Sequence, residues 1–115
     1  FCIVVEGQLD AIHIDGCALG GSEIADQQAM LLNRLQKQII VVPDRDKAGS
    51  KLVEESIEKG WCVSMPEWSQ DICDVGDAVS KYGRLYTLYS IVNAANESPL
   101  KIRLRAKKWF ISENL

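Results

Sequence analysis

The sequence lacks any long hydrophobic run, and none of its apolar stretches approaches the ~20 residues that a membrane span requires. It also lacks the pattern of a signal peptide, in which a positively charged segment is followed by an apolar run and a cleavage site of small residues. We therefore predict no membrane span and no membrane partner. The chain begins with an apolar segment, residues 1–5, rather than with Met, so we expect it to be a piece of a larger polypeptide.

Paired metal-binding cysteines and histidines are missing as well. The chain has four cysteines and one histidine, and no two cysteines stand in a CxxC spacing. Structural zinc sites use such pairs, so we predict no zinc in this chain. A chain of this size can bury a core without disulfides. Cys2 and Cys62 stand in apolar segments typical of buried strands. These features favour a reducing compartment, the cytoplasm.

Positive charge is scarce, because 13 Lys and Arg face 16 Asp and Glu and give a net charge of −3. This balance argues against a protein that binds nucleic acid unaided, since phosphate contacts need Lys and Arg. The basic residues are nevertheless concentrated in residues 101–108. One interpretation is a solvated helix face or a linker. The other is a contact with a phosphate backbone or with a basic neighbouring domain.

Short apolar segments alternate with longer amphipathic ones along the chain. This alternation predicts an α/β fold in which a four-stranded, mainly parallel sheet is flanked by helices. The crossovers are expected to be right-handed, but the order of the strands cannot be predicted. The strands are predicted at residues 1–5, 17–19, 38–42 and 61–65, and the helices at 8–14, 22–35, 46–59, 74–83, 85–95 and, after a break at Ser98-Pro99, up to 110.

Acidic side chains follow two of the predicted strands. Glu6 comes directly after the first strand, and Asp44 and Asp46 come after the third. The carboxyl ends of parallel strands lie at one edge of a sheet, where ligands bind in α/β folds. Alternate residues of an extended segment face the same side, so Asp44 and Asp46 can face one ion together. Hard divalent cations such as Mg²⁺ prefer such carboxylates.

Each aspartate also has a purely structural interpretation. Asp46 could cap the helix that follows it. Asp44 could pair with Arg45 or Lys47 at the surface, and we expect Arg45 to be a solvated surface charge. Glu6 has no capping role to explain it, because it ends a strand and precedes a glycine. The three acids together favour a metal site.

These residues carry a family resemblance. The motifs Glu6-Gly7, Asp10, Leu19-Gly20 and Asp44-x-Asp46 with Gly49 resemble the Toprim domain over residues 1–82. Toprim is the Rossmann-like catalytic module of bacterial and phage primases, topoisomerases, OLD-type nucleases and recombination mediators. The segments 5–10, 18–21 and 44–49 are most similar to those of primases of the bacterial and phage type, and we expect a phage-like origin.

The resemblance implies a role for individual residues. Asp44 and Asp46 would be the main Mg²⁺ ligands, with Mn²⁺ as a substitute, and Glu6 an acid–base or metal-bridging carboxylate. Asp10 would be a supporting catalytic acid. Contacts to phosphate or nucleic acid would come from Lys47, Gly7 and Gly20.

A second acidic element follows the fourth predicted strand. Asp74 and Asp77 resemble the Lys-Asp-x-x-Asp/Glu element of primases, with Cys73 in place of the basic residue. The resemblance implies a metal-binding role for Asp74. The alternative is that Asp74 caps a helix and Asp77 stands in its first turn.

The resemblance also implies an activity. It implies a Toprim catalytic domain at residues 1–83, followed by a helical extension at 84–115. The activity would be Mg²⁺-dependent nucleotidyl transfer in a DNA primase that makes RNA primers in DNA replication. A DNA template, nucleoside triphosphates, other domains of the same polypeptide and a helicase are the candidate partners. The alternatives are a Toprim nuclease or topoisomerase module, or a non-catalytic interaction domain as in recombination mediators.

Overall fold

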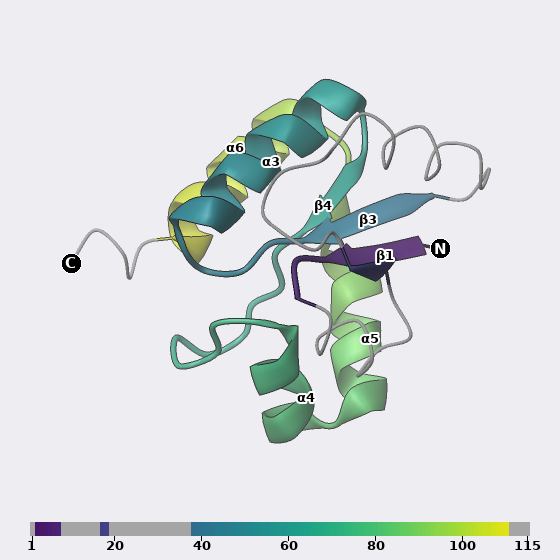
Figure 1. Cartoon of the computed structure of the whole chain (residues 1–115), viewed down its shortest axis with the longest axis vertical. Helices are drawn as coiled ribbons and strands as arrows, with labels where there is room; N and C mark the ends of the chain where they lie inside the picture. Colours follow the sequence, from purple (N-terminus) through teal and green to yellow (C-terminus); the bar gives the residue numbers. More distant parts are fainter. Residues whose placement is uncertain (1, 8–16, 19–37, 111–115) are drawn as a thin grey trace.

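The structure, a computed structural model, describes residues 2–7, 17–18 and 38–110 (Figure 1). The helices predicted at 8–14 and 22–35 lie outside these residues. The described elements are β1 (Cys2–Val5), β2 (Cys17–Ala18), β3 (Ile39–Val42), α3 (Lys47–Lys59), β4 (Cys62–Ser64), α4 (Val75–Tyr82), α5 (Arg84–Ala94), β5 (Ala95–Asn96) and α6 (Pro99–Trp109).

The strands form one sheet in the order β2-β1-β3-β4-β5. The first four are parallel, which confirms the predicted fold class. The short β5 runs antiparallel to β4 and was not predicted, because its first residue continues the helical pattern of residues 85–95. The chain moves outward in one direction from β1 to β2 and in the other from β3 to β4. The boundary between β1 and β3 is therefore the topological switch point of the sheet.

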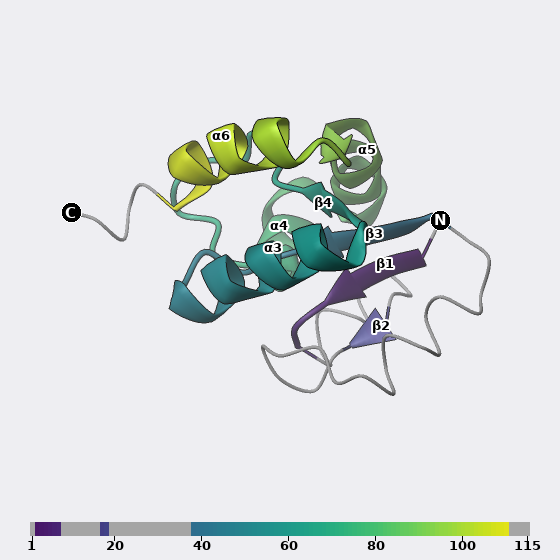
Figure 2. The same ribbon diagram turned by 90° about the horizontal axis from the view of Figure 1, so that it is seen from above.

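Apolar side chains cover both faces of the two central strands. Val4 and Val41 pack in one buried cluster with Leu52 of α3. Their neighbours Val5 and Val42 belong to a second cluster that includes residues of α4, α5 and α6. Figures 1 and 2 show α3 and α6 side by side on one side of the strands, with α4 and α5 on the other. A strand enclosed in this way has no polar face, which explains the continuous apolar sequence of β3.

The ends of α3 match the sequence signals. Asp46 precedes the helix in an extended conformation and caps it, and Gly60 ends it in the left-handed region at φ 75°. Glycine is favoured there because it has no Cβ to oppose a positive φ. The helix direction then carries the chain back across the sheet into β4.

The C-terminal segment shares the core of the sheet. Ile91 of α5 and Ile102 and Trp109 of α6 are fully buried in the cluster that also contains Val5 and Val42. The domain boundary between residues 83 and 84 stays a prediction. Among the helices described, none combines the length and apolarity of a transmembrane segment.

Candidate metal centre

Glu6 lies at the switch point of the sheet, directly after β1. The parallel register pairs Val5 with Val42, so the residues that follow the two strands leave the sheet side by side. The backbone N–H of Asp44 donates to Oε2 of Glu6 at 2.8 Å. The Glu6 side chain is only 9% exposed. A buried carboxylate thus joins the end of β1 to the loop that follows β3.

Asp46 begins α3. Its Oδ1 accepts a hydrogen bond from the Gly49 N–H at 2.7 Å, and its own N–H donates to the Asp44 carbonyl at 2.9 Å. The capping interpretation of Asp46 is therefore confirmed. This cap uses one carboxylate oxygen, so it is compatible with a metal bound at the other.

Gly49 allows the loop to fold back on the helix. A Cβ atom at this position would lie 1.9 Å from the carbonyl oxygen of Asp44 and 2.9 Å from its carbonyl carbon. The first turn of α3 thus packs directly on the Asp44 backbone. This close approach explains why a glycine follows Asp44 by five residues.

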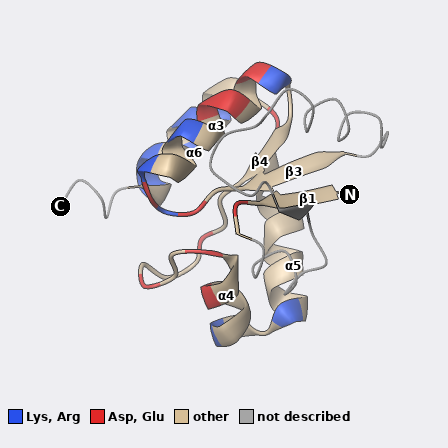
Figure 3. Ribbon diagram, viewed as in Figure 1, with Lys and Arg blue, Asp and Glu red and all other residues tan. Residues whose placement is uncertain are grey.

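The three predicted acids come together in the structure. Glu6, Asp44 and Asp46 each offer a carboxylate oxygen, and these atoms lie within 4.8 Å of one another. Two oxygens bound to one Mg²⁺ at about 2.1 Å can be up to about 4.2 Å apart, so small side-chain rotations suffice to bind an ion. The set contains only hard oxygen donors, and Asp46 is exposed. It fits Mg²⁺ or Mn²⁺ with room for a substrate oxygen. Figure 3 shows these acidic loops between the helix pairs.

Arg45 differs from its prediction as a solvated surface charge. It is 8% exposed, and its guanidinium donates to the carbonyls of Ser69 at 2.8 Å and Trp68 at 3.1 Å. It also lies 4.2 Å from the centre of the Trp109 ring. Burial, together with the nearby Arg105, lowers the pKa of Arg45. The surface-charge prediction is therefore wrong, and Arg45 holds the β3–α3 loop against the core.

Strand alternation in the sequence would also turn Arg45 away from the two aspartates. In an extended segment, a residue between two others that face one side must face the opposite side. If Asp44 and Asp46 face an ion, the side chain between them turns toward the protein. In the structure the Asp46 N–H to Asp44 carbonyl bond closes a turn at Arg45, so the inward direction of Arg45 depends on this turn and on its bonds to Ser69 and Trp68, for which the sequence has no local signal.

Asp74 caps α4. The Asp77 N–H donates to Asp74 Oδ1 at 2.8 Å, and the Cys73 N–H donates to Asp77 Oδ2 at 3.1 Å. These two bonds form a reciprocal cap, as the structural alternative predicted. The Arg45 N–H donates to the Cys73 carbonyl at 2.9 Å, which joins this loop to the loop of the acids. Within the described ranges, the cluster of acids that could hold a metal does not include Asp74, whose metal role stays a prediction.

Substitutions of Asp74 separate its two roles. Asp74→Ala is expected to lower the free energy of unfolding by about 1 kcal/mol, whereas Asp74→Asn should leave it within about 0.5 kcal/mol because Asn caps helices equally well. Denaturant unfolding measures both. An equal loss in the two variants would contradict the cap. If Asp74 also binds metal, Asp74→Asn will weaken the stabilisation by Mg²⁺ while the metal-free protein remains unchanged.

The other predicted site residues divide into two groups. Gly7 follows Glu6 and is half-buried, and Lys47 is exposed as the first residue of α3. Their phosphate contacts stay predictions. Asp10 and Gly20 lie outside the described residues.

Comparison with known proteins places this geometry in a family. The sequence model of the Toprim-like family matches residues 3–78. The crystal structure of the Aquifex aeolicus primase, covering its zinc-binding and RNA polymerase domains, has a similar fold with a TM-score of 0.66 and 22% identity. The alignment covers 98% of this chain and 30% of the primase chain. No curated protein gives a significant match. The chain therefore belongs to the Toprim-like family, with a fold similar to that of a primase core.

Proposed function

We propose that this chain provides the Mg²⁺-dependent catalytic site for nucleotidyl transfer in a DNA primase that makes RNA primers. The observation that carries the proposal is the cluster of Glu6, Asp44 and Asp46 at the switch point, with oxygens within 4.8 Å. Ligands in open α/β sheets bind at such a point. The similarity of the fold to a primase core supports the choice of reaction.

The three acids of this site would have different roles. Asp44 and Asp46 would hold the ion, and Mn²⁺ could replace Mg²⁺ there. When bound, the ion supplies a positive charge that orients a phosphate and stabilises the charge that develops on it. Glu6, whose Oε2 accepts the Asp44 N–H, would bridge to the ion or take the proton of an attacking hydroxyl.

The residues around the acids would bind the substrate. Lys47 is exposed at the start of α3, where a cation can contact a phosphate held by the ion. Gly7 has no side chain to prevent close backbone approach, and the same role is proposed for Gly20. Asp10 is proposed as a supporting acid and Asp74 as a further metal ligand.

Other domains of the same polypeptide would complete the enzyme. The chain spans 30% of the length of the primase chain, and its net charge of −3 is unfavourable for holding a template alone. The proposed partners are a DNA template, nucleoside triphosphates and a helicase, in a cytoplasmic replication setting.

An assay of the polypeptide that contains this chain tests the proposal. With single-stranded DNA, ribonucleoside triphosphates and Mg²⁺, we expect dinucleotides and longer primers. Asp44→Asn should lower the rate at least about 100-fold, the upper end of what hydrogen-bonded neighbours of metal ligands contribute. Cleavage of DNA without dinucleotide formation would contradict primer synthesis and favour a Toprim nuclease. Absence of both reactions, with metal binding retained, would favour an interaction domain.

A further inference from the structure

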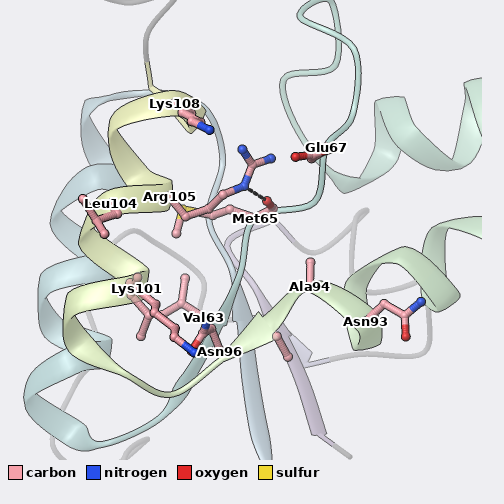
Figure 4. Close-up of a pocket in the computed structure, with 12 residues that line it drawn as sticks. Val63, Met65, Glu67, Asn93, Ala94, Asn96, Lys101, Leu104, Arg105 and Lys108 are labelled. Carbon is pink, nitrogen blue, oxygen red and sulfur yellow. Dashed lines mark hydrogen bonds between the residues drawn. The ribbon is translucent and has the colours of Figure 1, made fainter.

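A pocket of about 460 Å³ lies between α6 and the ladder of β4 and β5 (Figure 4). Its apolar lining consists of Val63, Met65, Ala94, Ala95, Ile102 and Leu104. Its size falls within the range of sites that bind small groups. The polar residues that line it are Glu67, Asn93, Asn96, Lys101, Arg105 and Lys108.

One side of this pocket is strongly basic. Lys101, Arg105 and Lys108 stand at positions i, i+4 and i+7 of α6, so they share one face of the helix over a length of about 10 Å. A single acid, Glu67, accompanies them in the lining. Neither lysine forms an ion pair with another residue in the described part of the chain. In a chain of net charge −3, three cations on one face form a local positive surface that favours anions.

Arg105 is held in place by the segment that follows β4. Its Nε donates to the Met65 carbonyl at 2.6 Å. Figure 4 shows the outer end of its guanidinium directed toward the space between Lys108 and Glu67. A cation fixed in this way loses little conformational freedom when it binds an anion.

A second hollow adjoins the pocket on the side of the β3–α3 loop. It shares Glu67, Arg105 and Lys108 with the first and extends to Arg45 and Trp68. Arg45 stands between two of the clustered acids in the chain and contacts Trp109 at the end of α6. The two hollows thus extend from the basic face of α6 to Arg45, the residue between Asp44 and Asp46 in the chain.

We propose that Lys101, Arg105 and Lys108 form a track for the backbone of single-stranded nucleic acid, leading to the metal centre. Three cations in a row of about 10 Å can face consecutive phosphates of one strand. The apolar floor and the Asn93 and Asn96 amides suit an unstacked base, which a duplex does not offer. That the track leads to a catalytic metal centre rests on the proposed function. Binding of the strand to the track requires no metal.

A pair of charge-matched double variants tests the track. Lys101→Gln/Lys108→Gln removes two charges from the pocket, and Arg103→Gln/Lys107→Gln removes two charges elsewhere on α6. All four side chains are exposed, and Arg103 instead pairs with Glu54 of α3 at 3.3 Å. Arg105 is left intact because it bonds to Met65. Fluorescence anisotropy of a labelled single-stranded oligonucleotide, in EDTA and from about 50 to 200 mM salt, measures binding.

We expect the pocket variant to bind at least about tenfold more weakly, and the slope of log K against log salt to fall by about 1.4, since each lost phosphate contact contributes about 0.7. The control variant should bind within about twofold of the parent chain. Equal losses in the two variants, or none in either, would overturn the track. A duplex that binds as tightly as the single strand and loses as much affinity would also overturn it.

The result is independent of the metal centre. Because EDTA removes divalent cations, a variant with Asp44→Asn and Asp46→Asn should bind the strand at least as well as the parent chain. Strand binding that persists in this variant while primer synthesis is lost supports both proposals. Loss of strand binding in the pocket variant alone, with no primer synthesis by the polypeptide that contains this chain, supports the track and contradicts the proposed reaction.

Discussion

Replacement of Gly49 by alanine is expected to lower the free energy of unfolding by more than about 3 kcal/mol, beyond the usual range for overpacking. The new Cβ would lie 1.9 Å from the Asp44 carbonyl oxygen, which belongs to the backbone and cannot turn aside like a side chain. The first turn of α3 or the Asp44 loop must then shift. Urea unfolding followed by circular dichroism measures the change.

Gly60→Ala is the matched control. Gly60 ends the same helix at φ 75°, and no atom lies within 4 Å of a Cβ placed there. Its replacement should therefore lower stability by only about 1 kcal/mol, the usual penalty for a left-handed alanine. If Gly49→Ala is no more harmful than Gly60→Ala, the close approach of α3 to Asp44 is incorrect.

Replacement of both Asp44 and Asp46 by asparagine is expected to abolish Mg²⁺ binding while preserving the fold. Asparagine caps a helix as well as aspartate does, so α3 keeps its start. The bond from Asp44 to Glu6 comes from the backbone and does not depend on the Asp44 side chain. Removal of two charges from three crowded carboxylates also relieves repulsion in the metal-free protein.

Thermal unfolding across a Mg²⁺ titration measures this effect. A ligand at 100 times its Kd stabilises the folded protein by about 2.7 kcal/mol. The Tm of the parent chain should therefore rise with the Mg²⁺ concentration, whereas the Tm of the double variant should not. Titration calorimetry with Mn²⁺ gives the affinity directly. The control is Glu58→Gln/Glu97→Gln, which removes two exposed negative charges outside the cluster. Equal binding by the parent chain and the asparagine variant would refute the metal centre.

Much of the local structure could be predicted from the sequence. The ends of α3 follow from Asp46 and Gly60, and the buried strands β1 and β3 follow from continuous apolar runs. Capping and side-chain burial depend on residues within a few positions of one another. Short-range signals of this kind remain readable without a structure.

The placement of the acids was predictable only in part. Because Glu6 and Asp44 follow predicted strands, the sequence predicted that they lie at the same edge of the sheet. It did not predict that they are neighbours, because the order of the strands has no local signal in the sequence. The order β2-β1-β3 and the pairing of Val5 with Val42 bring residues 38 positions apart into hydrogen-bond contact. Such pairing is selected by the packing of whole elements and not by any one segment.

The sequence by itself determined the composition of the site: two strand ends with three carboxylates, a capped helix and a glycine for close approach. Only the tertiary structure decided which strands are adjacent, that Arg45 turns inward to the Trp68 and Ser69 carbonyls, and that α6 brings its basic face beside β5. The physical reason is the sequence distance over which each interaction acts. Periodicity and capping act within one element, whereas strand order, burial of a charge and the lining of a pocket depend on contacts between elements far apart in the chain.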